Sequence, residues 1–395
     1  MRQGWRWYGP DSGISLDAIR QAGASDIVTA LHHVPIGEAW TAAEVAERKS
    51  LIEDTPHGRT QFVWSVVESI PVDDAIKRKG AEAASEIDCW IASMKAVAEN
   101  GIGIICYNFM PVVDWTRTDL DYETQTGSTA MRFDQDRFAV FDLHILQRPD
   151  ADEEYSGAER DRAKALYESM SEAQIEALTR NIASALPGST TEPLTIGEFR
   201  EKLDLYAGID ARRLRSNFVD FLKAVTPVAE ELGVKLALHP DDPPRSLFGL
   251  PRIVSTGEDY HALFEAVPSP SNGMCFCTGS LGVRADNDLV AIARKFAARI
   301  HFAHLRATKR EGDGKSFHES AHLEGDVDMV AVIRELLKEE QKRNPDEKIV
   351  FRPDHGQRML SDFDEDSAPG YPAIGRLRGL AELRGIMTAL EAGED

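Results

Sequence analysis

Cysteine is scarce in this sequence, and basic residues are fewer than acidic ones. Four cysteines in 395 residues are too few for a disulfide framework. The 45 lysines and arginines stand against 66 aspartates and glutamates, a net charge of -21. No basic stripe is visible, which argues against a nucleic-acid partner, because phosphate neutralisation supplies most of the affinity in such complexes.

Long apolar runs are also missing. No stretch of about 18 apolar residues occurs, so we predict no membrane span. The first ten residues, MRQGWRWYGP, contain no apolar segment of the kind found in signal peptides. Mixed surface charge and few cysteines together predict a reduced, cytoplasmic protein.

The glycine motifs of dinucleotide- and phosphate-binding folds are absent too. What the sequence contains is a repeated alternation of short apolar runs, rich in Val and Ile, with segments of helical period. The strands are expected at residues 3–7, 26–31, 61–67, 103–108, 235–239, 273–277, 300–305 and 348–352. The helices are expected at residues 15–22, 41–52, 73–99, 211–232, 286–297, 327–342 and 372–392. Eight such units favour an α/β fold closed as a (β/α)8 TIM barrel over an open doubly wound sheet.

The alternation breaks once, over residues 116–210, after the fourth strand. This segment contains charged helical stretches at 158–170 and 172–185. A long excursion after a barrel strand lies on the C-terminal face, where the active sites of such barrels are found. We therefore predict one barrel domain, residues 1–395, with a large helical insertion that caps this face or serves as an oligomerisation arm. The length of the insertion favours a homodimer.

Four potential metal ligands stand at the ends of the last four strands: His239, Cys277, His304 and Asp354. Each residue alone has an ordinary structural explanation, such as a packed histidine or a buried thiol. Because the C-terminal ends of barrel strands converge on one centre, their joint occurrence predicts a coordination site. Cys275 shares a face with Cys277 but lies deeper in the strand, and His301 is expected on the opposite face, as a packing residue.

Two imidazoles, a thiolate and a carboxylate suit Zn²⁺, Fe²⁺, Co²⁺ or Mn²⁺ better than Mg²⁺ or Ca²⁺. A tetrahedral zinc ion would be closed by these four ligands, whereas octahedral Fe²⁺ or Mn²⁺ would keep two positions open for a substrate. The C-terminal face favours the open site. Arg306 and Arg352 flank the predicted ligands and suit a carboxylated substrate. Trp7 and Asn108, at the ends of the first and fourth strands, are candidates for contacts with a polyol chain.

Several longer motifs resemble those of mannonate dehydratases of the xylose-isomerase-like barrel type. They are Arg6-Trp-Tyr-Gly-Pro10, Phe62-Val-Trp-Ser-Val-Val-Glu-Ser-Ile-Pro71, Cys106-Tyr-Asn-Phe-Met-Pro-Val-Val-Asp-Trp115, His239-Pro-Asp-Asp-Pro-Pro244, His304-Leu-Arg306 and Arg352-Pro-Asp-His-Gly356. The resemblance implies dehydration of D-mannonate to 2-dehydro-3-deoxy-D-gluconate, by loss of the C2 proton and the C3 hydroxyl, in hexuronate catabolism. It also implies Mn²⁺ or Fe²⁺ on the same four ligands. The acid/base residues of the family match His355 and Tyr371.

Two other functions fit parts of this pattern. A sugar isomerase or epimerase of the same barrel type would act on neutral sugars, and it would be expected to place more carboxylates around its metal. A sugar-acid sensor or a zinc-stabilised scaffold would hold a closed, four-coordinate ion, and replacing His355 would leave it intact. The flanking arginines and His355 favour the dehydratase over both.

Overall fold

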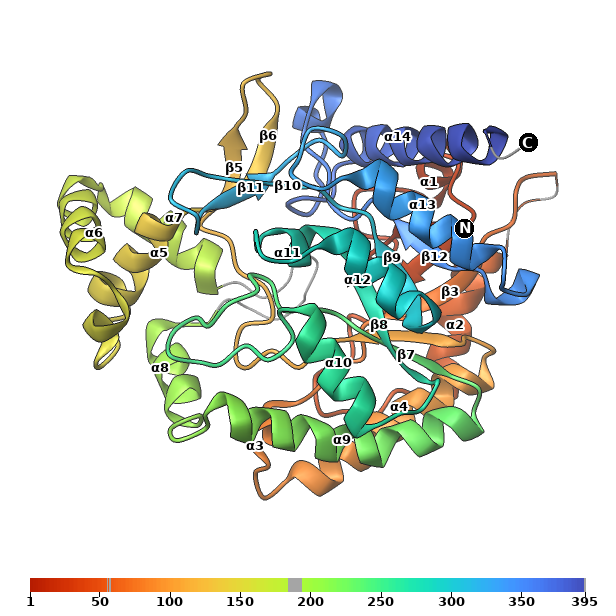
Figure 1. The fold of residues 1–395 in the computed structure, drawn as a ribbon, viewed down its shortest axis with the longest axis horizontal. Coiled ribbons are helices and arrows are strands. Elements are labelled where there is room, and N and C mark those ends of the chain that lie inside the picture. The colour runs from red at the N-terminus through yellow and green to blue at the C-terminus, as the bar shows by residue number, and fades with distance from the viewer. Residues whose placement is uncertain (55, 57, 184–193, 394–395) are drawn as a thin grey trace.

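The computed structural model describes residues 1–54, 56, 58–183 and 194–393 (Figure 1). Eight parallel strands form a closed barrel, with each strand hydrogen-bonded to its neighbours in the order β1, β2, β3, β4, β7, β8, β9, β12 and back to β1. Their bounds are β1 Arg2–Arg6, β2 Asp26–Thr29, β3 Val63–Glu68, β4 Ile104–Tyr107, β7 Lys235–Leu238, β8 Asn272–Cys277, β9 Ile300–His304 and β12 Val350–Arg352. All eight predicted strands are present, and the predicted closed barrel is confirmed.

Helices cover the outside of the barrel. They include α1 Leu16–Gln21, α2 Ala42–Glu53, α3 Asp74–Arg78, α4 Ala83–Glu99, α9 Ala211–Glu231, α10 Gly257–Ala266, α11 Thr278–Gly282, α12 Leu289–Phe296, α13 Met329–Glu340 and α14 Ala373–Ala392. Helix α2 begins at Thr41, whose side chain accepts a hydrogen bond from the Glu44 amide in a capping box. Among these helices, α10 and α11 were not predicted from the sequence.

The single helix predicted over residues 73–99 is wrong in one respect, because the structure divides it into α3 and α4. Lys79 ends α3 in the left-handed conformation (φ 58°), and Gly80 follows. A left-handed residue cannot continue a right-handed helix, so the chain turns before α4 begins.

A ring of buried side chains fills the centre of the barrel. Seven strands each contribute one of them: Val28, Val66, Cys106, Ala237, Cys275, Phe302 and Val350. A larger apolar cluster lies between the strands and the surrounding helices. This packing holds the strands in place and so fixes the directions in which the side chains at their C-terminal ends point.

The insertion begins with a β-hairpin, which the helical prediction missed. Strands β5 Asp119–Glu123 and β6 Thr129–Phe133 join β10 Thr308–Arg310 and β11 Phe317–Glu319 in an antiparallel sheet ordered β10-β11-β6-β5. Helices α5 Gln135–Val140, α6 Gly157–Ser169, α7 Glu172–Ala183 and α8 Ile196–Asp204 follow and lie to one side of the barrel (Figure 1). The end of the predicted helix 172–185 lies outside the described residues.

The insertion has its own apolar core, built around Phe133, Phe138, Phe141 and Phe199. This core also contains side chains from the loops after β7, β8 and β9: Leu247, Phe248, Val283 and Phe317. The insertion therefore packs against the C-terminal ends of the barrel strands. None of the described helices is long and apolar enough to cross a membrane.

Candidate active site

The four predicted metal ligands lie at the C-terminal ends of four neighbouring strands. Cys277 and His304 are the last residues of β8 and β9, His239 directly follows β7, and Asp354 lies two residues beyond β12. The ligand atoms of His239, Cys277 and His304 all lie within 4.8 Å of one another. Asp354 Oδ2 lies 3.9 Å from Cys277 Sγ and 3.8 Å from His304 Nδ1. The fold thus brings all four side chains together.

The state of these side chains suits a metal ion. His304 is 1% exposed, and its Nε2 atom lies 3.3 Å from Glu68 Oε1, yet neither of its ring nitrogens forms a hydrogen bond with a described residue. A buried polar atom without a partner costs free energy, so its retention points to a missing ligand. Burial lowers the pKa of His239 although Asp354 and Glu68 oppose this shift, which leaves the neutral imidazole that metals bind. His239 Nδ1 lies 2.7 Å from the Pro240 carbonyl, which leaves Nε2 for coordination.

The backbone at Asp354 is unusual for an aspartate at the end of a strand. Its φ is 65°, in the left-handed region that residues other than glycine rarely adopt. Such conformations persist where the surrounding structure holds them, and they cluster at functional sites. Here the conformation turns the carboxylate toward the donor set.

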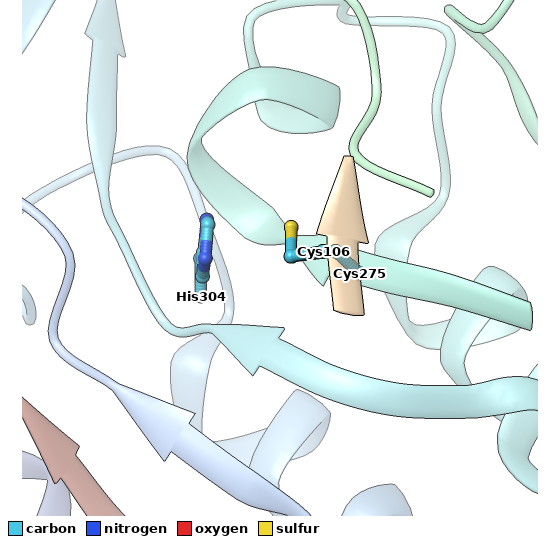
Figure 2. A group of neighbouring side chains, drawn as sticks. All are labelled: Cys106, Cys275 and His304. Atoms are coloured by element: carbon cyan, nitrogen blue, oxygen red, sulfur yellow. The ribbon is translucent and has the colours of Figure 1, made fainter. Parts of the chain in front are cut away.

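His304 also belongs to a second group of ligand atoms, formed with Cys106 and Cys275 (Figure 2). Cys106 lies in β4, and Cys275 precedes Cys277 in β8 by two residues, so this group lies one layer deeper in the barrel. Burial raises the pKa of both thiols. His301, by contrast, lies 3.0 Å from the Pro270 carbonyl through its Nε2 atom and takes no part in either group, as predicted.

A buried network of four arginines and four carboxylates surrounds the donor set. Glu68 pairs with Arg6 at 2.8 Å and with Arg352 at 2.7 Å. Arg352 also contacts Asp354. Arg306 pairs with Asp242 and with Glu319, both at 2.7 Å. Since equal numbers of opposite charges face one another, the network is close to neutral.

Arg117 completes this network from the first residues of the insertion. It lies 2.8 Å from Asp242 and 3.0 Å from Glu319, and its side chain is fully buried. Glu319 itself belongs to β11, in the sheet that the insertion completes. The insertion is therefore joined to the site by buried ion pairs as well as by its apolar core.

His355 and Tyr371 face each other beside the donor set. Their ring centroids are 5.0 Å apart, in an edge-on arrangement. His355 Nδ1 lies 3.2 Å from Glu319 Oε1, and His355 Nε2 lies 3.7 Å from Asp354 Oδ1. Burial would raise the pKa of Glu319, but Arg306, His355 and Arg117 outweigh it and hold that pKa at about 2. The carboxylate is therefore ionised where it faces His355 Nδ1.

Tyr371 is 2% exposed and lies among cationic side chains. The guanidinium carbons of Arg376, Arg6 and Arg352 are 5.3, 6.0 and 6.0 Å from its ring centroid. Burial raises the pKa of Tyr371 although Arg352 and Arg6 oppose the shift. The phenol therefore carries its proton at neutral pH and can donate it.

One cavity of about 460 Å³, open to solvent, joins these groups. The predicted site residues that line it are Asn108, His239, Arg306, Arg352, Asp354, His355 and Tyr371. Arg306 and Arg352 line the cavity, and their guanidinium groups are paired with carboxylates. Their contact with a substrate stays a prediction.

Trp7 does not line this cavity, which corrects one of the predictions for substrate binding. Its indole N–H donates to the Ile14 carbonyl at 3.1 Å, and its ring borders a smaller, neighbouring cavity. Trp7 follows the last residue of β1, and successive side chains of a strand point to opposite sides. Arg6, one residue earlier, is the side chain that faces the site.

Sequence reasoning missed Glu68, Asp242, Glu319, Arg6 and Arg117. Glu68 and Arg6 end β3 and β1, so the rule that strand ends meet at one face could have found them. Asp242 could have been found as well, because it lies three residues after the predicted ligand His239, in the motif His239-Pro-Asp-Asp-Pro-Pro244. No sequence pattern could have predicted Glu319 and Arg117, because they reach the site through a sheet whose strands are far apart in sequence.

The fold and the site define a (β/α)8-barrel protein whose C-terminal face brings together two histidines, a cysteine and an aspartate beside a His–Tyr pair. The family model described as D-mannonate dehydratase (UxuA) matches residues 1–395. A mannonate dehydratase of Brucella canis is 69% identical over 392 residues, covering 99% of this chain and 98% of its own. One from Chromohalobacter salexigens is 53% identical and covers 99% of each chain. The chain belongs to the D-mannonate dehydratase family.

Solved structures agree with this assignment. The crystal structure of mannonate dehydratase from Streptococcus suis serotype 2 matches with a TM-score of 0.76 and 30% identity, covering 100% of this chain and 94% of that one. The 3-keto-D-glucoside 4-epimerase YcjR from E. coli matches with a TM-score of 0.50 and 13% identity, which shows a shared barrel fold alone.

Proposed function

We propose that this protein dehydrates D-mannonate to 2-dehydro-3-deoxy-D-gluconate as a metal-dependent hydro-lyase. One observation carries the proposal: two residues of the donor set, His239 and Asp354, and the His355–Tyr371 pair line a single cavity in a chain that matches this family over its full length. The product, substrate and reaction type follow from the family. The roles below follow from where the side chains lie.

The metal is proposed to be Mn²⁺ or Fe²⁺, held by His239, Cys277, His304 and Asp354. When bound, a divalent cation offsets the negative charge that builds on the substrate carboxylate as the C2 proton leaves. The surrounding arginines and carboxylates cancel, so an ion of charge +2 with the Cys277 thiolate leaves about one positive charge. That charge suits a monoanionic sugar acid.

His355 is proposed to take the proton from C2. We assign the ring proton to Nδ1, which lies 3.2 Å from Glu319 Oε1, and the lone pair that accepts the C2 proton to Nε2. The electron pair of the C2–H bond forms the C2=C3 double bond, and the C3–O bond breaks. Tyr371 donates its phenolic proton to the departing hydroxyl, which leaves as water. The resulting enol tautomerises to the 2-keto product, and proton exchange with solvent restores both side chains.

The test is product formation by the metal-loaded protein. We expect a colorimetric assay for keto-deoxy acids to detect product from D-mannonate with Mn²⁺ or Fe²⁺ added. Tyr371→Phe and His355→Gln should each lower kcat by about 10²–10⁴-fold, the usual range for loss of an acid or base. Matched controls are Tyr167→Phe and His261→Gln, which change the same residue types on α6 and α10. No product with either metal overturns the proposal.

The isomerase alternative predicts carboxylates around the metal, and the structure places three near the site that were not predicted from the sequence. Glu68, Asp242 and Glu319 all surround the site, but each is paired with arginine. Those pairings neutralise the carboxylates, which leaves the positive charge of a bound ion free to attract an acid substrate. Conversion of a neutral ketose, in place of D-mannonate, would favour the isomerase.

The homodimer and the cytoplasmic location also stand as proposals. All four cysteines are free thiols, which fits a reducing compartment. Light scattering coupled to gel filtration should give twice the chain mass of 43.7 kDa. A mass of one chain would overturn the dimer.

A further inference from the structure

Cys106 and Cys275 are not used by the proposed reaction, but they form a group with His304, which is a ligand of the proposed metal. Cys106 and Cys275 belong to the ring of side chains that fills the barrel, directly below the donor set. In Figure 2 the His304 ring lies across from the two labelled cysteines, which overlap in this view. Their ligand atoms all lie within 4.8 Å of one another, although the three residues come from three different strands.

We propose that these three side chains form a second metal site, for a thiophilic d¹⁰ ion such as Zn²⁺ or Cd²⁺. Two sulfur ligands and one imidazole match the preferences of such ions, whereas Mg²⁺, Ca²⁺ and Mn²⁺ prefer oxygen. The two donor sets therefore differ in kind. The upper set includes a carboxylate and two imidazoles, and the deeper set is dominated by sulfur.

The geometry is close to what such an ion needs. Ligand atoms around tetrahedral zinc stand roughly 3.5 Å apart, given Zn–S and Zn–N lengths of about 2.3 and 2.0 Å. With separations limited to 4.8 Å here, inward movements of about an ångström bring the ligands into place. Neither cysteine is held in a disulfide, and neither His304 nitrogen forms a hydrogen bond with a described residue, with Glu68 Oε1 at 3.3 Å from Nε2.

An ion can reach the deeper set from the active-site face. Cys106 lines the solvent-open cavity, together with His239 and Asp354 of the upper set. Binding breaks one S–H bond in each cysteine and forms two S–metal bonds, and the two protons pass to solvent. No oxidant or reductant is needed. His304 belongs to both sets.

Cadmium absorption of the full-length, metal-free protein tests the site, because each Cd–thiolate bond adds ultraviolet charge-transfer absorbance. All variants carry Cys89→Ala, which removes the half-buried thiol of α4. Cys277→Ala then keeps the deeper pair, and the Cys106→Ala/Cys275→Ala double variant keeps Cys277 alone. We expect the first protein to show about twice the absorbance per bound Cd²⁺ of the second.

Absence of the charge-transfer band from the Cys277→Ala protein overturns the proposal. If the double variant fails to fold, Cys106→Ala is added to the Cys277→Ala protein instead, where it should halve the band. An unchanged band in that variant also overturns the proposal. No substrate is present in these measurements, so the result is independent of the proposed reaction.

Discussion

Glu319 offers a direct test of how the buried ion network stabilises the protein and orients His355. Its carboxylate, 2% exposed, faces Arg306, Arg117 and His355 at 2.7, 3.0 and 3.2 Å. Burial opposes ionisation, but the arginines and His355 hold the pKa at about 2, against an ordinary value of 4.5. At about 1.4 kcal/mol per pH unit, this difference corresponds to about 3 kcal/mol of stability.

The substitution Glu319→Gln keeps the shape of the side chain and removes its charge. We expect the free energy of unfolding at pH 7 to fall by about 3 kcal/mol, which agrees with the 3–5 kcal/mol typical of breaking a buried ion pair. Because the folded-state pKa is depressed, the contribution is complete above pH 4.5 and is lost as the pH falls toward 2. The difference between wild type and variant should therefore shrink over that interval.

Urea denaturation followed by tryptophan fluorescence, at pH 7 and at several values below 4.5, measures these differences. The matched control is Glu168→Gln, which removes the charge of a carboxylate in an exposed pair with Lys164 and should not change the midpoint. In the same variant we expect kcat for D-mannonate to fall by about 10–100-fold, as His355 loses its partner. A Glu319→Gln protein as stable as wild type at pH 7 would refute the electrostatic reasoning.

Three further predictions concern the metal, the packing behind the site and the insertion. Cys277→Ala should reduce bound Mn²⁺ or Fe²⁺ per chain, measured by elemental analysis after gel filtration, and a full complement of metal would contradict the assigned donor set. Gly279→Ala should lower kcat/KM about tenfold or more, because the added Cβ would lie 2.4 Å from Arg306 Cγ and Cδ and displace that guanidinium from the cavity. Gly103→Ala, with open space around its Cβ, is the control. Equal activity of the two variants would count against a role of Arg306 in substrate binding. Arg117→Ala should cost about 3–5 kcal/mol in urea denaturation, since Asp242 and Glu319 both lose a buried partner, and a change below about 1 kcal/mol would show that the insertion is not anchored there.

The barrel and the group of four potential ligands could both be predicted from the order of the amino acids. Short apolar runs separated by helical segments leave few arrangements other than a parallel sheet covered on both faces, and the strand ends of a closed barrel converge. His239, Cys277, His304 and Asp354 were therefore predictable as a group. The motifs around them also pointed to the family before any side chain was placed in space.

The details of local conformation were harder to predict. The helix expected over residues 73–99 is interrupted at Lys79, because one residue with a left-handed backbone is enough to end a helix. Trp7 was expected at the site, but Arg6 is the residue that lines the main cavity. A shift of one residue at a strand end reverses the direction of the side chain, and periodicity does not fix strand ends that closely.

The tertiary structure alone decided the electrostatics of the site. Glu319 and Arg117 are separated by about two hundred residues and meet only because the insertion hairpin pairs with β11. The same pairing brings Glu319 to His355 and places arginines against the carboxylates that would otherwise compete for a metal. Charge interactions depend on distance and burial, which sequence spacing does not encode, so the donor set could be predicted from the sequence and the network that supports it could not.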